Sequence, residues 1–346
     1  MIQRHTKQPP QEIARPVRRK EILLTLLGSL LILLLANVAT ILYLPKHGTN
    51  WGDRIIEYKW QMLLHMDEPV NWLILGDSSG ATAVVPSIID QTLGGTSVNL
   101  CTHGGLGIVN DAWMLDTYIE RFGPPKAVLL VHFPSAWNTN PVLYSLLQIP
   151  LGWGFWSRLQ PPVELSPKQS FDAFLTRYAP LYSHSTTMNL LLKTPWLASA
   201  SDPSFQDNGL LLLPRADPSA VIAQAQEMIS SVTGTEVVFN EVAEGAFEHI
   251  AALAEQFNFD VYLANGPIYE GLTENQEYLA YLSRFGDWLD TFAAKHERVH
   301  YVLRKPVTFP ADLMELTVHV IGSAAPQYTE ALVSDILYNV QNSTSD

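Results

Sequence analysis

The sequence predicts an α/β protein: a three-layer sandwich around a mostly parallel five-stranded sheet, preceded by one transmembrane helix. From residue 71 onward, short apolar runs that end in glycine alternate with longer segments of helical periodicity. Repeated strand–helix–strand units give a parallel sheet that is covered by helices on both faces. The 346 residues are 47% apolar and 10% aromatic, which is enough for a sizeable core.

Residues 21–44 are expected to span a membrane as one helix. The run from residue 22 reads ILLTLLGSLLILLLANVATILYL and has no charge over 23 residues. At about 1.5 Å per residue, it can cross a hydrocarbon core of roughly 30 Å. A cleavable signal peptide has a shorter apolar stretch, and the segment from Ala36 to Ala39 is a poor cleavage site. A buried core helix of this length would keep a polar face. The pattern therefore favours an uncleaved signal-anchor helix.

Charge predicts the orientation of this helix. Residues 1–20 form a basic tail, and residues 1–21 hold six basic and two acidic side chains. Basic flanks stay in the cytoplasm, so the chain should cross the cell membrane once, with a cytoplasmic N-terminus and an extracytoplasmic domain. The chain beyond residue 21 holds 15 basic and 32 acidic side chains, which disfavours nucleic acid as a partner. The single cysteine, Cys101, excludes an internal disulfide.

The remaining chain divides into a connecting segment and one domain. Residues 45–70 are expected to form a linker and a juxtamembrane helix at 51–66, although a helix packed into the domain fits the same spacing. Residues 71–346 are expected to form the domain. Its predicted strands are 71–75, 96–102, 126–133, 260–265 and 300–303, and its predicted helices are 84–93, 110–122, 240–257, 275–296 and 323–340, the last with Ser323 as N-cap.

Residues 134–218 interrupt the alternation as an insertion. They hold eleven prolines, and helices are expected only near 169–178 and 185–193. An insertion after the carboxyl end of a strand is placed to form a lid or a binding wall. The alternative is a structural excursion that packs on the sheet or on the membrane surface. Trp153 and Trp156 could stack on sugar rings, but buried packing or membrane contact is the more frequent role of such a pair.

Polar residues that could carry chemistry follow the predicted strands. Ligands of open parallel sheets bind at the carboxyl ends of the strands. The first strand is followed by Asp77 and Ser78, the second by His103 and Gly104, and the fourth ends at Asn265. A serine in a tight strand-to-helix turn exposes its hydroxyl group, and nearby backbone N–H groups can hold an oxyanion.

A base for this serine would have to come from the far end of the chain. His319 lies just before the last predicted helix, and a carboxylate beside it would orient the ring. Asp77 is expected to hold its turn through backbone N–H groups. His103 and His132 are expected to be structural. The alternative, a metal site built from His103, His132, His319 and Asp77, matches no ligand-spacing signature.

The order of these motifs resembles the SGNH, or GDSL-type, hydrolase superfamily over roughly residues 71–340. The segment Leu73-Ile74-Leu75-Gly76-Asp77-Ser78 is similar to the first block of that superfamily, which implies Ser78 as nucleophile. The segment Asn99-Leu100-Cys101-Thr102-His103-Gly104 looks like the second block, whose glycine lends an oxyanion N–H. His319 before Ala325-Pro326-Gln327-Tyr328-Thr329 resembles the last block. The resemblance implies a flavodoxin-like sheet and no cofactor.

Two departures from the family pattern stand out. The third block, Gly-x-Asn-Asp, is replaced by Val131-His132-Phe133-Pro134-Ser135-Ala136, so the asparagine donor is missing; Asn138 and Asn265 are candidate substitutes. The position three residues before His319 is Leu316 rather than Asp. Glu315 and Asp312 are therefore the candidate orienting carboxylates.

With its anchor, the chain is most similar to the extracytoplasmic branch that includes DltD-type and alginate O-acetylation proteins. That branch implies a serine esterase or O-acyltransferase acting on acylated glycan or another envelope polymer. A transferase would also need an acyl donor passed on by a membrane partner. The alternative is a catalytically degraded binding or scaffold subunit of an envelope-polymer assembly. A metal-dependent hydrolase is a weaker third hypothesis.

Overall fold

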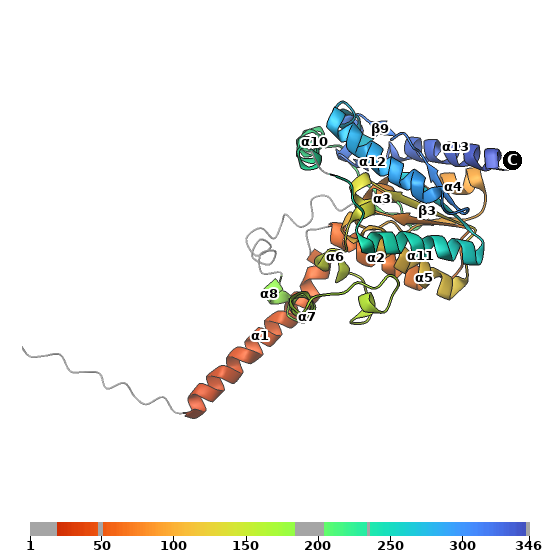
Figure 1. The fold of residues 1–346 in the computed structure, drawn as a ribbon. Helices are drawn as coiled ribbons and strands as arrows, with labels where there is room; N and C mark the ends of the chain where they lie inside the picture. The colour runs from red at the N-terminus through yellow and green to blue at the C-terminus, as the bar shows by residue number, and fades with distance from the viewer. Residues whose placement is uncertain (1–18, 48–50, 184–203, 234–235, 344–346) are drawn as a thin grey trace, which may run out of the picture.

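The computed structural model describes residues 19–47, 51–183, 204–233 and 236–343 (Figure 1). It confirms the predicted fold class. Five parallel strands form one sheet: β1 (Trp72–Gly76), β2 (Ser97–Asn99), β3 (Ala127–His132), β6 (Asp260–Asn265) and β8 (Val299–Val302). Helices flank the sheet on both sides, and an apolar N-terminal helix precedes them.

The strand order is β2-β1-β3-β6-β8. The chain therefore starts near the middle of the sheet, moves outward to β2, and returns past β1 to β3. In an open parallel sheet this reversal leaves a crevice at the carboxyl ends of β1 and β3, because the connections leave in opposite directions. The reversal thus places the turn after Gly76 and the turn after His132 next to each other.

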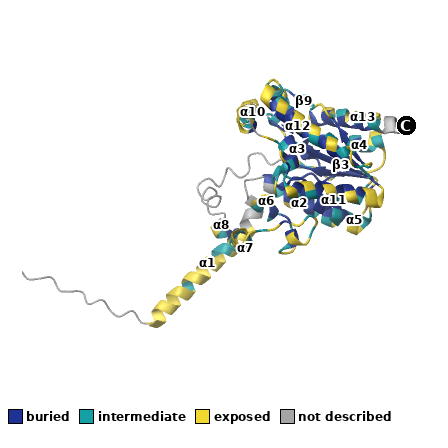
Figure 2. Cartoon of the chain, in the orientation of Figure 1, coloured by how far each residue is buried: buried dark blue, intermediate teal, exposed yellow. Residues whose placement is uncertain are grey.

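Helices form the two outer layers of the sandwich. Figure 1 shows α2 (Trp51–His65), α5 (Gly107–Phe122) and α11 (Glu241–Phe257) on one face of the sheet. The opposite face carries α3 (Ser78–Ala83), α4 (Pro86–Leu93), α12 (Gln276–Ala293) and α13 (Ala325–Ser343). Both faces of β1 and β3 are buried, which explains the apolar runs Trp72–Leu75 and Ala127–Val131 (Figure 2).

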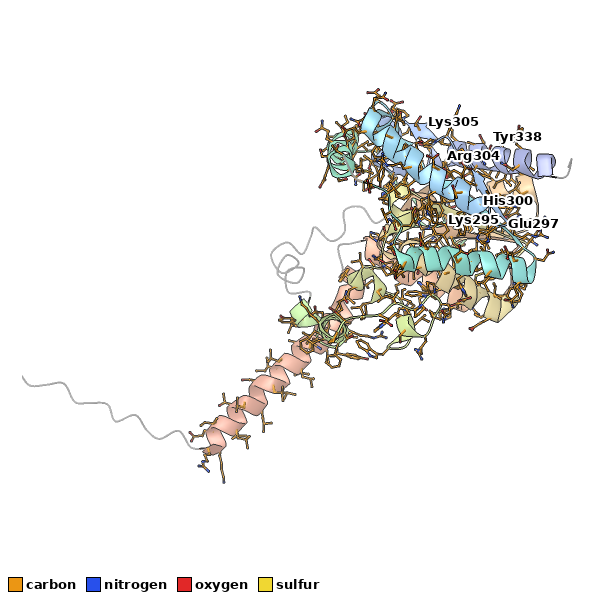
Figure 3. The ribbon with its side chains drawn as sticks, in the orientation of Figure 1. Lys295, Glu297, His300, Arg304, Lys305 and Tyr338 are labelled. Carbon is orange, nitrogen blue, oxygen red and sulfur yellow. The ribbon has the colours of Figure 1, made fainter. Side chains whose placement is uncertain are left out.

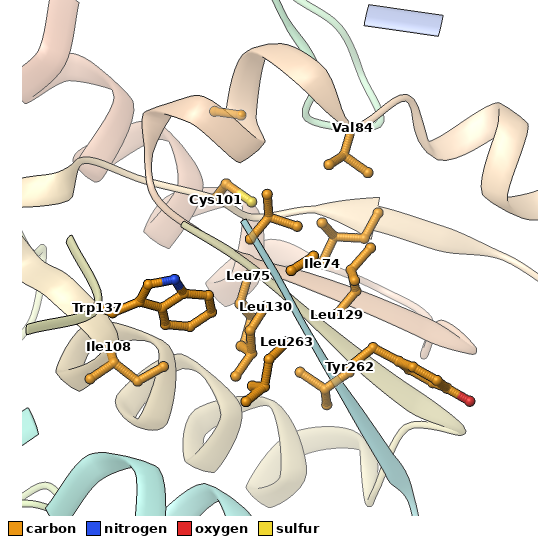
Figure 4. Close-up of a cluster of buried hydrophobic side chains, with 14 of the residues drawn as sticks. Ile74, Leu75, Val84, Cys101, Ile108, Leu129, Leu130, Trp137, Tyr262 and Leu263 are labelled. Atoms are coloured by element: carbon orange, nitrogen blue, oxygen red, sulfur yellow. The ribbon is translucent and has the colours of Figure 1, made fainter. Parts of the chain in front are cut away.

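The core lies where these layers meet. Leu75, Leu130 and Leu263 come from three neighbouring strands and are completely buried, and Trp137 packs beside them (Figure 4). Each such side chain contributes roughly 1.5–3 kcal/mol by leaving water.

Several element boundaries differ from the sequence expectation. The helix expected at 84–93 is observed as α4, which begins at Pro86 because Val85 precedes a proline and stays extended, and the short helix α3 before it was not expected. The last helix begins at Ala325, so Ser323 is not its N-cap as predicted. Instead Ser323 lies in a turn closed by a hydrogen bond from the N–H of Ala324 to the carbonyl of Ile321.

Short elements fill the inserted region, and a helix that sequence reasoning missed follows it. The elements are η2 (Pro134–Asn138), α6 (Leu143–Leu146), η3 (Phe155–Ser157), α7 (Pro167–Tyr178), α8 (Pro180–Ser183), β4 (Ser204–Phe205), β5 (Leu211–Leu212) and the missed helix α10 (Pro218–Val232). The helix expected near 185–193 lies outside the described residues.

Short segments complete the carboxyl edge of the sheet. They are η1 (Gly104–Leu106), β7 (Ile268–Tyr269), η5 (Glu270–Leu272), β9 (Thr308–Phe309), η6 (Ala311–Leu313), β10 (Met314–Leu316) and β11 (His319–Val320). β10 and β11 pair as a two-stranded antiparallel ladder, and this ladder packs against α3.

The two N-terminal helices differ in their surroundings. Within the described residues, α1 (Arg19–His47) includes a stretch at 19–42 that is long and apolar enough to cross a membrane, and its large apolar side chains are exposed. In contrast, α2 is packed into the domain, where Ile55, Trp60 and Leu63 are fully buried. Lys59 is also buried, and its Nζ donates to the carbonyl of Asn99 at 2.6 Å. The segment is therefore a helix packed into the domain.

Gly76 provides a test of how tightly β1 and β3 approach each other. Its φ is +140°, and a Cβ at this position would lie 1.9 Å from the carbonyl oxygen of Val131. Gly76→Ala should therefore lower the free energy of unfolding by about 3 kcal/mol or more, because backbone has to move. Gly123→Ala is the matched control: its φ is +79°, with no atom near the added Cβ, so it should cost only about 1–2 kcal/mol. Urea unfolding would measure both, and equal costs would contradict the collision.

Candidate active site

The turn between β1 and α3 presents Ser78 at the carboxyl edge of the sheet. Gly76 ends the strand, Asp77 is the N-cap of α3, and Ser78 is the first helical residue. The first N–H groups of a helix have no acceptor within the helix, so the N–H of Ser78 is available to a ligand. The hydroxyl group and a backbone donor thus lie on the same residue.

His319 lies against Ser78, although 241 residues separate them in the chain. The Nε2 atom of His319 is 2.8 Å from Oγ of Ser78, and each residue is only 6% exposed. The contact forms because the β10–β11 ladder packs on α3. A serine hydroxyl that donates to an imidazole nitrogen at this distance is in the geometry required for proton transfer.

Glu315 lies on the other side of the His319 ring. Its Oε2 is 3.5 Å from Nδ1 of His319. The β10–β11 ladder changes register between Met314 and Leu316, so Glu315 sits at the irregular position of the strand. Asp312, the other candidate, is exposed in η6. The structure therefore brings together Ser78, His319 and Glu315 in a row and leaves Asp312 outside it.

Asp77 ties the nucleophile turn to the neighbouring strand. Its Oδ1 accepts hydrogen bonds from the N–H of Ser79 at 2.7 Å and from Oγ of Ser79 at 2.6 Å. Its Oδ2 accepts from the N–H of Phe133 at 2.9 Å. The side chain is completely buried. Both carboxylate oxygens are thus used to hold backbone, as its position in the turn predicts.

His132 forms a buried charged network with two aspartates. Its Nε2 is 2.5 Å from Oδ2 of Asp111, and its Nδ1 is 3.5 Å from Oδ2 of Asp77. Burial opposes the charged imidazolium, but Asp111 and Asp77 together outweigh burial and raise the pKa of His132 to about 9. Burial likewise acts to raise the pKa of Asp77, yet the hydrogen bonds from His132, Ser79 and Phe133 lower it.

Sequence reasoning missed Asp111 altogether. Burial raises the pKa of its carboxyl group, and His132 only partly offsets this. The signal was present in the chain: an acid beside Asn110 within the otherwise apolar run from Ile108 to Leu115, which is buried throughout in α5. A buried carboxylate on an apolar face needs a charged partner, and His132 at the end of β3 provides it.

The loop after β2 lies beside the nucleophile turn. The N–H of Thr102 donates to the carbonyl of Gly76 at 2.8 Å, and Gly104 follows two residues later in η1. His103 caps η1 by accepting from the N–H of Gly105 at 3.1 Å. Burial lowers the pKa of His103; Asp77 opposes the shift and His319 adds to it. A neutral His103 therefore stands near the site.

The two candidate amide donors are engaged elsewhere. Asn265 accepts from Nε1 of Trp137 at 3.0 Å and donates to the hydroxyl group of Tyr301 at 2.6 Å. Asn138 donates through its amide to the carbonyl of Val238 and accepts from the N–H of Asn240. Among the described residues, neither side chain hydrogen-bonds to Ser78. The amides thus serve local structure.

A cavity of about 290 Å³ is lined by residues next in the chain to His132 and His319, although Ser78 and His319 themselves do not line it. Phe133 and Val318, the neighbours of His132 and His319 in the chain, form part of its wall. Its other lining side chains come from α10, α12 and the adjoining segments; they are Ser135, Gln224, Met228, Ser231, Val232, Tyr278, Tyr281 and Thr317. None of these lining residues is charged. A neutral group of moderate size fits such a space.

Among the residues that the structure describes, no group of three or more His, Cys, Asp or Glu side chains is gathered as metal ligands. The histidines of the alternative metal site are separated in function: His132 pairs with Asp111, His103 caps η1, and His319 contacts Ser78.

Comparisons with known proteins add little to this geometry. No protein-family model and no curated protein matches the chain. A solved structure described as "a putative platelet activating factor from Streptococcus pneumonia" is similar to it with a TM-score of 0.37 and 12% identity, over 85% of this chain and 97% of that chain. A similarity at this level says nothing about activity, so only the arrangement of the side chains bears on function.

The buried network predicts a pH-dependent contribution to stability. His132 has a pKa of about 9 in the fold and 6.5 outside it, so the folded state holds the proton more tightly. The stabilisation is complete below pH 6.5 and is lost as pH rises through about 9. His132→Gln should therefore lower the free energy of unfolding more at pH 6 than at pH 9, and the two losses should differ by up to about 3 kcal/mol.

The measured quantity is the difference in unfolding free energy between wild type and variant at each pH. This choice matters because burial lowers the pKa of Lys59 to about 7, which acts in the opposite direction: stability is gained as pH rises above that value. His249→Gln is the matched control, since His249 pairs with Asp116 at 2.9 Å near the surface. If the His132→Gln difference is the same at pH 6 and pH 9, the network is not charged as described.

Proposed function

We propose that the protein is a membrane-anchored serine esterase or O-acyltransferase of the SGNH type, acting on acyl groups of extracytoplasmic glycan or another envelope polymer. The observation that carries the proposal is the 2.8 Å contact between Oγ of Ser78 and Nε2 of His319, with Glu315 behind the ring. A serine, a histidine and a carboxylate in this order form the arrangement used for acyl transfer on unrelated folds.

The proposed chemistry proceeds through an acyl-enzyme. Oγ of Ser78 attacks the carbonyl carbon of the ester while its proton passes to Nε2 of His319. The tetrahedral intermediate collapses, and His319 returns the proton to the departing alcohol. Water, or an acceptor hydroxyl group in a transferase, then attacks the acyl-serine by the same path in reverse. Glu315 stabilises the imidazolium form of His319 during both steps.

The proposed oxyanion donors are backbone groups. The N–H of Ser78 lies at the start of α3. Gly104 lies on the neighbouring loop, in which the N–H of Thr102 hydrogen-bonds to the carbonyl of Gly76. Gly104 leaves little room for a side chain, because a Cβ there would be 3.0 Å from the Phe133 ring. The amide of Asn265, predicted as a helper, is already used at both ends, so two backbone donors carry this role in the proposal.

The envelope setting rests on α1 and on charge. A helix of this length after a basic tail supports a single crossing with a cytoplasmic N-terminus. The domain would then meet substrates outside the cytoplasm. The uncharged cavity, whose wall includes Val318 next to His319 in the chain, suits a neutral acyl or sugar group. A transferase would receive its acyl group from a membrane partner, and a hydrolase would need none.

A second candidate function is a binding or scaffold subunit with this fold. It is favoured by one observation: the asparagine donor of the third block is absent, and His132 at that place is held by Asp111. In this case the contact between Ser78 and His319 would have no catalytic use, and the cellular role would not need the serine.

Labelling by a fluorophosphonate distinguishes the two functions. Wild-type protein in detergent should be labelled on serine, Ser78→Ala should not be labelled, and His319→Ala should react roughly 10²–10⁴ times more slowly. Ser230→Ala, at an exposed serine of α10, is the matched control and should react like wild type. Folded wild type that stays unlabelled would favour the scaffold subunit.

The choice of carboxylate gives an independent prediction. Glu315→Gln should slow labelling at least about tenfold, because the ring loses a negative partner. Asp312→Asn should have no effect, since this side chain is exposed in η6. The measurement is the second-order rate of probe incorporation at a fixed pH. A larger effect at Asp312 than at Glu315 would contradict the assignment.

A further inference from the structure

The inserted region carries an ordered aromatic surface next to α1. We call Trp153, Phe171, Phe174, Tyr178 and Tyr182 the α7–α8 aromatic patch. Their exposed fractions run from 40% for Trp153 to 70% for Tyr182. Phe171, Phe174 and Tyr178 recur at three- and four-residue intervals, so they form one stripe on α7, and Tyr182 lies beyond the break at Ala179, on α8. This stripe faces outward, whereas the apolar stripe of an ordinary surface helix faces the core.

Ring contacts join three members of the patch, Trp153, Phe174 and Tyr178. The centroid of Trp153 is 6.4 Å from that of Phe174 and 5.9 Å from that of Tyr178, and Phe174 and Tyr178 are 5.0 Å apart. On its inner side Trp153 packs on Trp156, which is buried, at 5.1 Å. A contiguous exposed aromatic surface marks an interaction site more often than scattered single residues do.

Hydrogen bonds fix the patch to α1. Nδ2 of Asn37 donates to the carbonyl of Tyr178 at 2.8 Å, and Oδ1 of Asn37 accepts from the N–H of Leu181 at 3.2 Å. Thr40, one turn further along α1, is buried at this contact region. Figure 1 shows α7 and α8 beside the upper part of α1. The side chain of Asn37, the only amide side chain in α1, thereby has its hydrogen-bond partners in the inserted region.

The position of Asn37 along α1 sets the depth of the patch. The apolar stretch ends at Leu42, five residues later. At about 1.5 Å per residue, the contact lies roughly 7–8 Å inside the end of that stretch. This depth matches the 5–10 Å or so at which apolar faces of interfacial helices enter the boundary between headgroups and acyl chains. Tyrosine and tryptophan rings are enriched at that level of a membrane.

We infer that the α7–α8 aromatic patch inserts into the outer lipid interface and forms a second membrane contact beside α1. The inference rests on the proposed membrane anchoring by α1. Lipid is the occupant because the patch continues directly from the apolar surface of α1. The opposite end of the domain differs: it carries Lys295, Glu297, His300, Arg304, Lys305 and Tyr338 (Figure 3). The two contacts together hold the domain in one orientation, so substrates are reached close to the membrane.

Depth-dependent fluorescence quenching of the full-length protein in phosphatidylcholine vesicles tests the inference. A nitrobenzoxadiazole label is placed at Phe174→Cys or, in a second variant, at Phe171→Cys; the native Cys101 is buried. Tyr338→Cys is the matched control, an exposed aromatic position 65% exposed at the far end of the domain. Leu30→Cys in α1 reports whether the anchor itself is inserted. The quencher is a lipid brominated on its acyl chain.

Labels at positions 174 and 171 should be quenched at least about twofold more than the label at 338, and iodide in the water should quench them less. If they behave like position 338 while position 30 is quenched by lipid, the patch is off the membrane and the inference is wrong, although the anchor stands. If position 30 is not quenched either, α1 is not inserted, and both the anchor and the patch proposal fail.

Discussion

The buried carboxylate of Asp77 is the interaction on which the site depends. One oxygen holds the first turn of α3 through Ser79, and the other holds the N–H of Phe133 at the end of β3. It therefore joins the two strand ends that the sheet order brings together. An ionised carboxylate in a dry interior is costly unless it is fully paired, and His132 provides the balancing charge. The position of Ser78 is thus fixed from within the sheet.

A second constraint is the length of chain between nucleophile and base. Ser78 is set by the first strand, whereas His319 arrives on a small ladder after the fifth. Only a folded sheet can bring them within 2.8 Å, so the contact is a product of tertiary structure and not of local sequence. The same ladder positions Glu315 through an irregular register. A site that is 6% exposed at both residues excludes most water, which strengthens the electrostatic pairing inside it.

Much of the fold could be predicted, because glycines and prolines mark the strand and helix ends in the chain. The pairing of Ser78 with His319 was also predictable, because Ser78 directly follows the first strand and His319 comes after the fifth, and a parallel sheet gathers the segments that follow its strands on one edge. The choice of Glu315 over Asp312 was not, because it depends on a bulge that no periodicity reveals. Asp111 was missed since a helix pattern shows which face is buried but not which strand end it meets. The helix at 218–232 was hidden by the proline-rich chain before it.

The central claim is that Ser78, His319 and two backbone donors form a working acyl-transfer site. A crystal structure of the protein after reaction with a fluorophosphonate tests it most directly, because the phosphonyl group mimics the tetrahedral intermediate. The claim predicts a bond from Oγ of Ser78 to phosphorus, with the phosphonyl oxygen about 2.7–3.1 Å from the nitrogen atoms of Ser78 and Gly104. An adduct on another residue, or a phosphonyl oxygen that points away from both N–H groups, would contradict it.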